Sequence, residues 1–88
     1  MPANELRQQL EDLRAQLAQK PALTEEDRAS LYILTQEIEL QLAQDAAAAP
    51  DATLVDGVNL AVERFEVSHP TLAGSLRNIL QSLANMGI

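Results

Sequence analysis

Residues Arg64–Leu72, with the sequence RFEVSHPTL, decide where the last two helices of the chain meet. A helix that arrives from the N-terminal side cannot continue through Pro70, because the proline ring disfavours helical geometry at the residue before it. The same proline suits the first position of a new helix. We therefore expect a structural corner, built from Phe65, His69 and Pro70, between two helices.

Apolar residues on both sides of this corner recur at helical spacing. A helix at about 53–67 places one group on a single face: Leu54, Val58, Ala61, Val62 and Phe65. A helix at about 70–86 carries a broader apolar face: Leu72, Leu76, Ile79, Leu80, Leu83 and Met86. Gly87 suits the left-handed position after a helix end, and Ile88 would then fold back toward Leu83, so Gly87 and Ile88 predict a C-terminal cap.

A second pair of helices precedes an Ala/Pro linker, where the chain is expected to break near 45–52. Thr24 followed by three acids predicts the start of a helix at about 25–46, because a hydroxyl caps the first turn and acids favour the positive end of the dipole. One stripe of this helix contains Leu31, Leu34, Ile38 and Leu42. Ile33 and Leu40 lie on nearly the opposite side, so they face either another helix of the chain or another copy.

The first helix is expected at about 5–19, with Asn4 as its N-cap and Pro21 beyond its end. It carries a leucine stripe at spacings of four, three and four residues, formed by Leu6, Leu10, Leu13 and Leu17. This spacing is typical of a short coiled-coil seam. The stripe predicts either a dimer interface or packing against the next helix of the same chain, and its two heptads are fewer than an independent coiled coil needs.

Together these patterns predict an all-α fold, a compact bundle of three to four helices arranged as two helical pairs within a single domain, 1–88. A chain of 88 residues buries only about 60–65% of the surface that its unfolded form exposes. Such a domain gains stability from a partner surface. We therefore expect a homo-oligomer, with a dimer favoured, and the interface candidates are Leu6, Leu10, Leu13, Leu17, Ile33 and Leu40.

The charge of the chain narrows the possible partners. Acidic residues outnumber basic ones by 13 to 6, which gives a net charge of −7. This charge opposes binding to nucleic acids and to anionic membranes, and it favours a basic protein partner. The chain has no cysteine, no apolar leader at its N-terminus and no stretch long enough to cross a bilayer, so we expect a cytoplasmic protein.

The histidine at the corner raises the question of metal binding. Glu66 and His69 have the Glu-x-x-His spacing of carboxylate-bridged di-iron bundles. That site needs a helix that continues through His69, which Pro70 opposes, and further glutamates projecting inward, whereas Glu63 and Glu66 lie off the apolar face. A structural corner is the favoured interpretation. The imidazole would then cap backbone N–H groups or contact Glu66, while metal binding by Glu66 and His69 stays an alternative.

Catalytic motifs are weak throughout the chain. One histidine with scattered hydroxyls supplies no oriented nucleophile, and the three glycines are too far apart for a phosphate-binding loop. We therefore expect no enzyme activity and no cofactor.

Four motifs also give the chain a family resemblance: Glu5-Leu6-Arg7-x-x-Leu10, Leu23-Thr24-Glu25-Glu26-Asp27-Arg28, Phe65-Glu66-Val67-Ser68-His69-Pro70-Thr71-Leu72 and Leu83-Ala84-Asn85-Met86-Gly87-Ile88. The chain resembles, over nearly its whole length, a family of short bacterial proteins known as domain of unknown function 4404. The last two motifs are the specific ones. The resemblance implies a small all-helical protein and brings no activity or ligand for any residue.

The expected function follows from these points. We expect a non-catalytic, self-associating helical module with a structural or protein-interaction role. Two alternatives stay open. One is an acidic adaptor or inhibitor that engages a basic protein through its Glu25–Asp45 surface, and the other is a metal-binding protein that uses Glu66 and His69.

Overall fold

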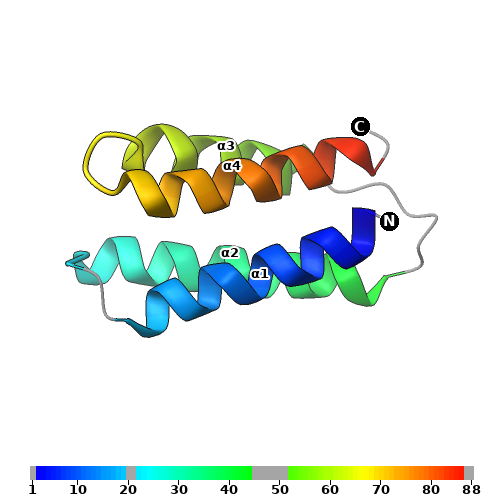
Figure 1. The fold of residues 1–88 in the computed structure, drawn as a ribbon, viewed down its shortest axis with the longest axis horizontal. Coiled ribbons are helices and arrows are strands. Elements are labelled where there is room, and N and C mark those ends of the chain that lie inside the picture. Colours follow the sequence, from blue (N-terminus) through cyan, green and yellow to red (C-terminus); the bar gives the residue numbers. More distant parts are fainter. Residues whose placement is uncertain (1, 20–21, 45–51, 87–88) are drawn as a thin grey trace.

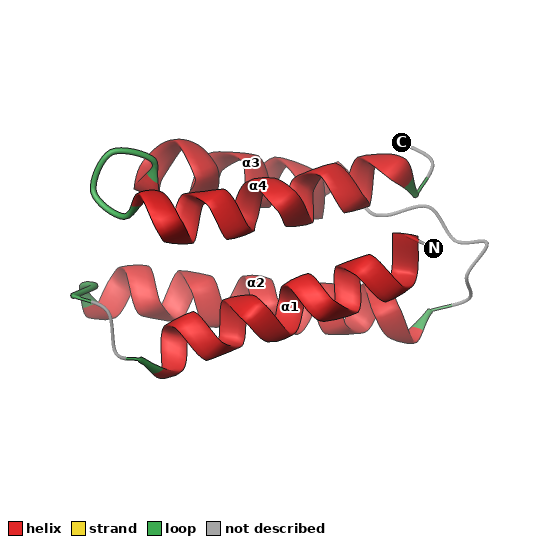
Figure 2. Cartoon of the chain, viewed as in Figure 1, coloured by secondary structure: helices red, strands yellow, loops and turns green. Residues whose placement is uncertain are grey.

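A computed structural model describes residues 2–19, 22–44 and 52–86, which form four helices: α1 (Pro2–Ala18), α2 (Glu25–Ala43), α3 (Ala52–Phe65) and α4 (Pro70–Asn85). The described residues contain no strand (Figure 2). Successive helices run in opposite directions, so that α1 begins at the end of the bundle where α4 finishes (Figure 1). The predicted all-α bundle is confirmed, with four helices in the described part of the chain.

The four helices surround one hydrophobic core in the order α1, α2, α3, α4. Helix α4 packs closely against both of its neighbours, α1 and α3, whereas α2 packs more loosely against α1 and α3. Each helix turns its apolar stripe inward, and the buried apolar side chains form a single cluster. Its members are Leu6, Leu10, Leu13, Leu17, Leu31, Leu34, Ile38, Leu54, Val58, Ala61, Val62, Phe65, Leu72, Ala73, Leu76, Ile79 and Leu83.

Two polar contacts fix α1 against α4. The Ser82 hydroxyl donates a hydrogen bond of 2.6 Å to Oε1 of Gln9, and Nε2 of Gln16 donates to the Ser75 hydroxyl. The two glutamines are seven residues apart on α1, and the two serines are seven residues apart on α4. This spacing matches two antiparallel helices held in one register. The sequence patterns did not predict these contacts.

The start of α2 confirms the predicted cap. The Thr24 hydroxyl accepts a hydrogen bond of 3.1 Å from the backbone N–H of Asp27, and the Thr24 carbonyl accepts one of 2.9 Å from the N–H of Arg28. The side chain therefore satisfies one of the backbone donors that a helix start leaves without an intrahelical partner. Glu25, Glu26 and Asp27 occupy the first turn, as expected.

Other helix bounds differ from the predicted ones. Helix α1 begins at Pro2, so Asn4 lies inside its first turn and is not the N-cap. A proline is tolerated there because a first-turn residue needs no N–H for the helix. Helix α2 ends at Ala43, since Gln44 has an extended backbone. Of the predicted break at 45–52, Ala52 is already the first residue of α3, and residues 45–51 lie outside the described residues, as does the predicted cap at Gly87 and Ile88.

Within the described ranges, no helix combines the length and apolarity that crossing a bilayer requires.

We expect the buried and exposed leucines to differ sharply in their contribution to stability. Leu13, on α1, is fully buried, whereas Leu40, on α2, is 65% exposed. Replacing Leu13 with alanine should lower the free energy of unfolding by about 2–5 kcal/mol, because it leaves a cavity in the core. The control Leu40→Ala should change it by no more than about 0.5 kcal/mol. Urea denaturation followed by circular dichroism measures both values, and equal losses would contradict the assignment of Leu13 to the core.

Candidate functional site

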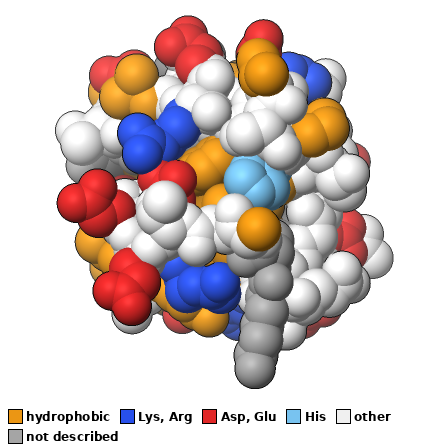
Figure 3. Space-filling model, turned by 90° about the vertical axis from the view of Figure 1, so that its left-hand side faces the viewer, with side chains coloured by type: hydrophobic (Ala, Val, Ile, Leu, Met, Phe, Trp, Pro, Cys, Tyr) orange, Lys and Arg blue, Asp and Glu red, His pale blue; other side chains and the backbone are white. Residues whose placement is uncertain are grey.

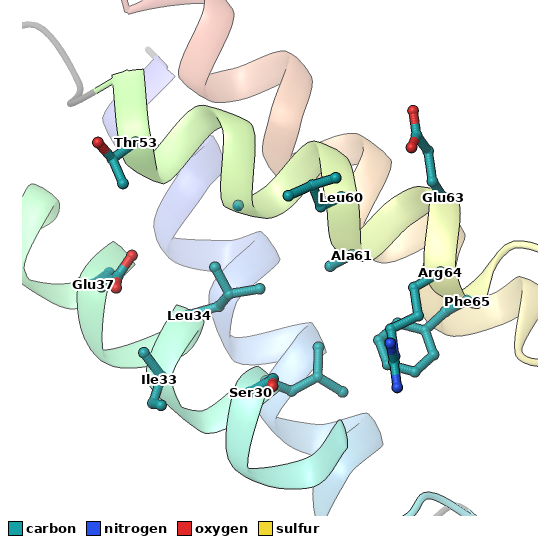
Figure 4. Close-up of a pocket in the computed structure, with 12 residues that line it drawn as sticks. Ser30, Ile33, Leu34, Glu37, Thr53, Leu60, Ala61, Glu63, Arg64 and Phe65 are labelled. Atoms are coloured by element: carbon teal, nitrogen blue, oxygen red, sulfur yellow. The ribbon is translucent and has the colours of Figure 1, made fainter. Parts of the chain in front are cut away.

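A groove of about 770 Å³ lies between α2 and α3. It forms on the side of the bundle where the helices pack loosely. Figure 4 shows Leu34 on α2 pointing toward α3, which carries Leu60 and Ala61, while Ile33 lies on the outer side of the α2 wall. The remaining lining residues are Ser30, Leu31, Glu37, Thr53, Gly57, Glu63, Arg64 and Phe65. We call this hollow the α2–α3 groove.

The floor of the groove is apolar, and its walls carry exposed aliphatic side chains. Leu34 and Phe65 belong to the hydrophobic core, so the floor is the outer surface of that core. Ile33 on the α2 wall is 55% exposed, and Leu60 on the α3 wall is 64% exposed. Both walls of the groove therefore expose a large aliphatic side chain to water.

At Gly57 the backbone of α3 lies close to a side chain of α2. A Cβ atom at this position would lie 3.2 Å from Cδ2 of Leu34, which is tighter than ordinary contact. A glycine therefore lets α3 rest against the Leu34 side chain.

A second hollow continues the groove toward the C-terminal end of α2. It shares Glu37 and Thr53 with the first hollow, and it adds Leu40 and Leu54 to the lining. Leu40 is the second residue of the predicted outer stripe of α2. Ile33 and Leu40 therefore lie along the same surface, one beside each hollow.

The groove is lined by two acidic residues and one basic residue. Nε and Nη2 of Arg64 on α3 both lie 2.6 Å from Oδ1 of Asp27 on α2, so this pair joins the two helices at one end of the groove. Glu37 and Glu63 also line the groove, and neither carboxylate forms an ion pair with any described residue. The net charge that the groove presents is therefore negative.

The six interface candidates separate into two groups. Leu6, Leu10, Leu13 and Leu17 are no more than 3% exposed, because the leucine stripe packs inside its own chain. The structure thus supports the interpretation that the stripe meets other helices of the same molecule. Ile33 and Leu40, in contrast, lie on the surface.

The predicted corner residues form the connection between α3 and α4. Phe65 ends α3, the backbone N–H of His69 donates a hydrogen bond of 2.8 Å to the Phe65 carbonyl, and Pro70 begins α4. Residues 66–68 form a turn, so α3 stops two residues earlier than predicted. Since His69 has a non-helical backbone, the chain reverses there.

The His69 side chain makes different contacts from the expected ones. It occupies the N-cap position of α4 but forms no side-chain capping bond. Its ring meets the ring of Phe65 edge to face, with centroids 5.9 Å apart, and Nδ1 lies 3.0 Å from the Ser68 hydroxyl. The predicted capping role was therefore wrong. In Figure 3 the histidine, in pale blue, covers hydrophobic atoms at this end of the bundle.

The two candidate metal ligands do not form a cluster with other ligand side chains. Glu66 lies 3.9 Å from Nη2 of Arg77, and no hydrogen bond joins it to His69 among the described residues. Three or more histidine or acidic side chains do not converge anywhere in the described part of the chain in a way that could hold a metal ion.

Leu60 is the residue of the groove that the sequence patterns missed. It lies off the apolar stripe of α3, as Ile33 and Leu40 lie off the main stripe of α2. An aliphatic residue outside the core-facing stripe is the signal that could have identified it.

The fold and the groove define a small antiparallel four-helix bundle with an apolar surface opening between two of its helices. The chain belongs to the family described as Domain of unknown function (DUF4404), whose model matches residues 6–88. The resemblance drawn from the sequence is thereby confirmed. Comparison with curated proteins and with solved structures gave no significant match.

The contacts at the corner lead to a test of Phe65 against His69. Phe65 is 2% exposed, so Phe65→Ala should lower the free energy of unfolding by about 3–5 kcal/mol. His69→Asn loses an edge-to-face ring contact but supplies a good N-cap side chain. Each effect on the free energy of unfolding is about 1 kcal/mol and they have opposite signs, so this variant should be about as stable as the unaltered protein. Urea denaturation of both variants measures the difference. A His69→Asn variant as unstable as Phe65→Ala would show that the imidazole itself holds the corner.

Proposed function

We propose that this protein is a non-catalytic interaction module that binds an α-helix of another protein in the α2–α3 groove. The observation that carries the proposal is the exposure of Ile33 and Leu60 on the two walls of a groove with an apolar floor. Covering such side chains removes apolar surface from water, which stabilises a complex by about 25 cal/mol for each Å² buried.

The dimensions of the groove fit a helix as the occupant. The α3 wall runs from Thr53 to Phe65, a distance of about 18 Å along a helix that rises 1.5 Å per residue. This length accommodates roughly three turns of a bound helix, enough for apolar anchors at positions i, i+3 or i+4, and i+7. Ile33, Leu60 and Leu40 would contact these anchors.

The residues that line the groove also support a binding role without catalysis. Half of its lining residues are aliphatic or aromatic, and the arginine among the others is paired with Asp27. The groove therefore offers apolar contact area along its length, with charged groups that would orient an occupant.

Self-association through the same face is a second candidate function, favoured by one observation. Ile33 and Leu40 are exposed and lie seven residues apart on α2, the spacing at which two helices pair along a common face. The α2 helix of a second copy could then pack against α2. In such a symmetric pair, Glu37, which lies between the two apolar residues, would approach its own counterpart and oppose the contact.

Peptide titration followed by nuclear magnetic resonance tests the proposed function. We expect an uncharged amphipathic peptide of about 18 residues, with leucine, isoleucine or phenylalanine as anchors, to shift resonances of α2 and α3. Ile33→Ser and Leu60→Ser should each weaken binding about tenfold, the effect of losing roughly 1.4 kcal/mol of apolar burial.

Val67→Ser is the matched control, because Val67 is an 89% exposed aliphatic residue at the corner, outside the groove. It should leave the affinity unchanged. If none of the peptides shifts resonances of α2 and α3, or if Val67→Ser weakens binding as much as Leu60→Ser, the groove is not the binding site.

Light scattering on a size-exclusion column tests self-association. If the second candidate holds, the protein elutes with twice its monomer mass of 9.6 kDa, and Leu40→Glu returns it to the monomer because a carboxylate cannot be buried at that contact. The control Val67→Glu should remain dimeric. A monomer at micromolar concentration in the unaltered protein would rule this candidate out.

A further inference from the structure

The charge of the bundle is concentrated on the side that carries the groove. Helices α2 and α3 together contain seven acidic residues and two arginines, for a net charge of −5. Helices α1 and α4 contain three acidic residues and three arginines, for a net charge of zero. The excess negative charge is thus a property of one half of the molecule, which the composition alone does not reveal.

The exposed aliphatic residues occupy the same half. Ile33 and Leu40 project from α2 and Leu60 projects from α3, whereas none of the described residues of α1 or α4 is a large exposed hydrophobic residue. Glu39 of α2 is paired with Arg14 of α1, but Glu37 and Glu63 line the same groove as the exposed Ile33 and Leu60. An occupant that matches this face must combine apolar anchors with positive charge.

The acids at the groove are placed to meet such an occupant. Glu37 belongs to the α2 wall and Glu63 to the α3 wall, and Figure 4 shows them near opposite ends of the groove, with the Glu63 carboxylate directed away from α2. The groove's arginine, Arg64, is already paired with Asp27 at 2.6 Å. Basic residues that flank the apolar stripe of a bound helix would approach Glu37 and Glu63 without meeting an unpaired cation of the groove.

We propose that the occupant of the α2–α3 groove is a basic amphipathic helix of a different protein, with lysine or arginine on both sides of its apolar stripe. This inference rests on the proposed function and adds the chemistry of the partner. The apolar stripe would cover Ile33 and Leu60, and the flanking cations would pair with Glu37 and Glu63.

A second copy of the chain fits this groove less well than a basic helix. The large exposed hydrophobic residues of the described structure lie on α2, α3 and the corner, so a second copy would present the same acidic face or the corner. Face-to-face pairing would bring Glu37 and Glu63 toward identical carboxylates. Like charges in close approach oppose that contact, whereas opposite charges favour the basic helix.

Fluorescence anisotropy with three peptides of identical apolar residues tests the inference. The flanking positions carry lysine in the first peptide, glutamine in the second and glutamate in the third. The lysine peptide should bind about tenfold more tightly than the glutamine peptide, and this advantage should disappear between about 50 mM and 500 mM salt because exposed charge pairs are screened. The glutamate peptide should bind most weakly.

The acids of the groove are tested with a charge-matched control. The double variant Glu37→Gln/Glu63→Gln should lower the affinity for the lysine peptide roughly fivefold, the effect of losing two exposed charge pairs. It should leave the glutamine peptide unaffected. The control Glu11→Gln/Asp12→Asn removes the same charge from exposed positions of α1 and should not change either affinity.

The outcomes separate this inference from the proposed function. If all three peptides bind equally, the groove binds helices but the basic partner is wrong. If the α1 variant weakens the lysine peptide as much as the groove variant does, attraction to the whole acidic protein explains the binding and the inference is overturned. If no peptide binds, the proposed function itself fails.

Discussion

The close packing of α4 against two neighbours is the constraint on which the rest of the bundle depends. The hydrogen bonds from Gln16 to Ser75 and from Ser82 to Gln9 tie α1 to α4. Helices α1, α4 and α3 thereby form a tightly packed unit. Helix α2 completes the core with Leu31, Leu34 and Ile38 but packs more loosely against both neighbours, and the groove opens along its contact with α3. The groove is thus located on the side of the bundle where the helices pack less closely.

If the α2–α3 groove binds a helix as proposed, its apolar surface and its carboxylates together would set which helix it binds. Exposed aliphatic side chains supply contact area but little selectivity, since many apolar surfaces would cover them. Carboxylates on both walls add selectivity, because they attract a cationic helix and repel an acidic one. The Arg64–Asp27 pair contributes by removing the cation that would otherwise oppose such a partner. Under the proposed function, charge would give the groove its selectivity and apolar contact would give most of its affinity.

The sequence predicted those features that depend on local spacing. The Thr24 cap, the helix break at Pro70 and the inward faces of α3 and α4 follow from hydrogen-bond chemistry and from a period of 3.6 residues, and the structure contains all of them. Periodicity says which face of a helix is apolar but not what covers that face. The leucine stripe of Leu6–Leu17 was therefore left between two interpretations, and Leu60 was missed. The contacts of His69 depend on a turn of three residues whose conformation no simple pattern encodes.

The pair of glutamine–serine bonds has a further consequence for the alignment of α1. The leucine stripe repeats every seven residues, so its apolar contacts would look much the same if α1 slid along α4 by one heptad. A slide in one direction would place Gln16 beside Ser82, and Gln9 and Ser75 would then both lose their hydrogen-bond partners. A slide in the other direction would place Gln9 beside Ser75 and leave the Ser82 hydroxyl without its hydrogen-bond partner, although Ser82 is only 2% exposed. Burying a hydroxyl without a hydrogen bond costs about 1–3 kcal/mol. The two glutamine–serine hydrogen bonds thus favour the observed alignment of α1 on α4 over the two alignments shifted by one heptad, which the leucine contacts alone would not distinguish.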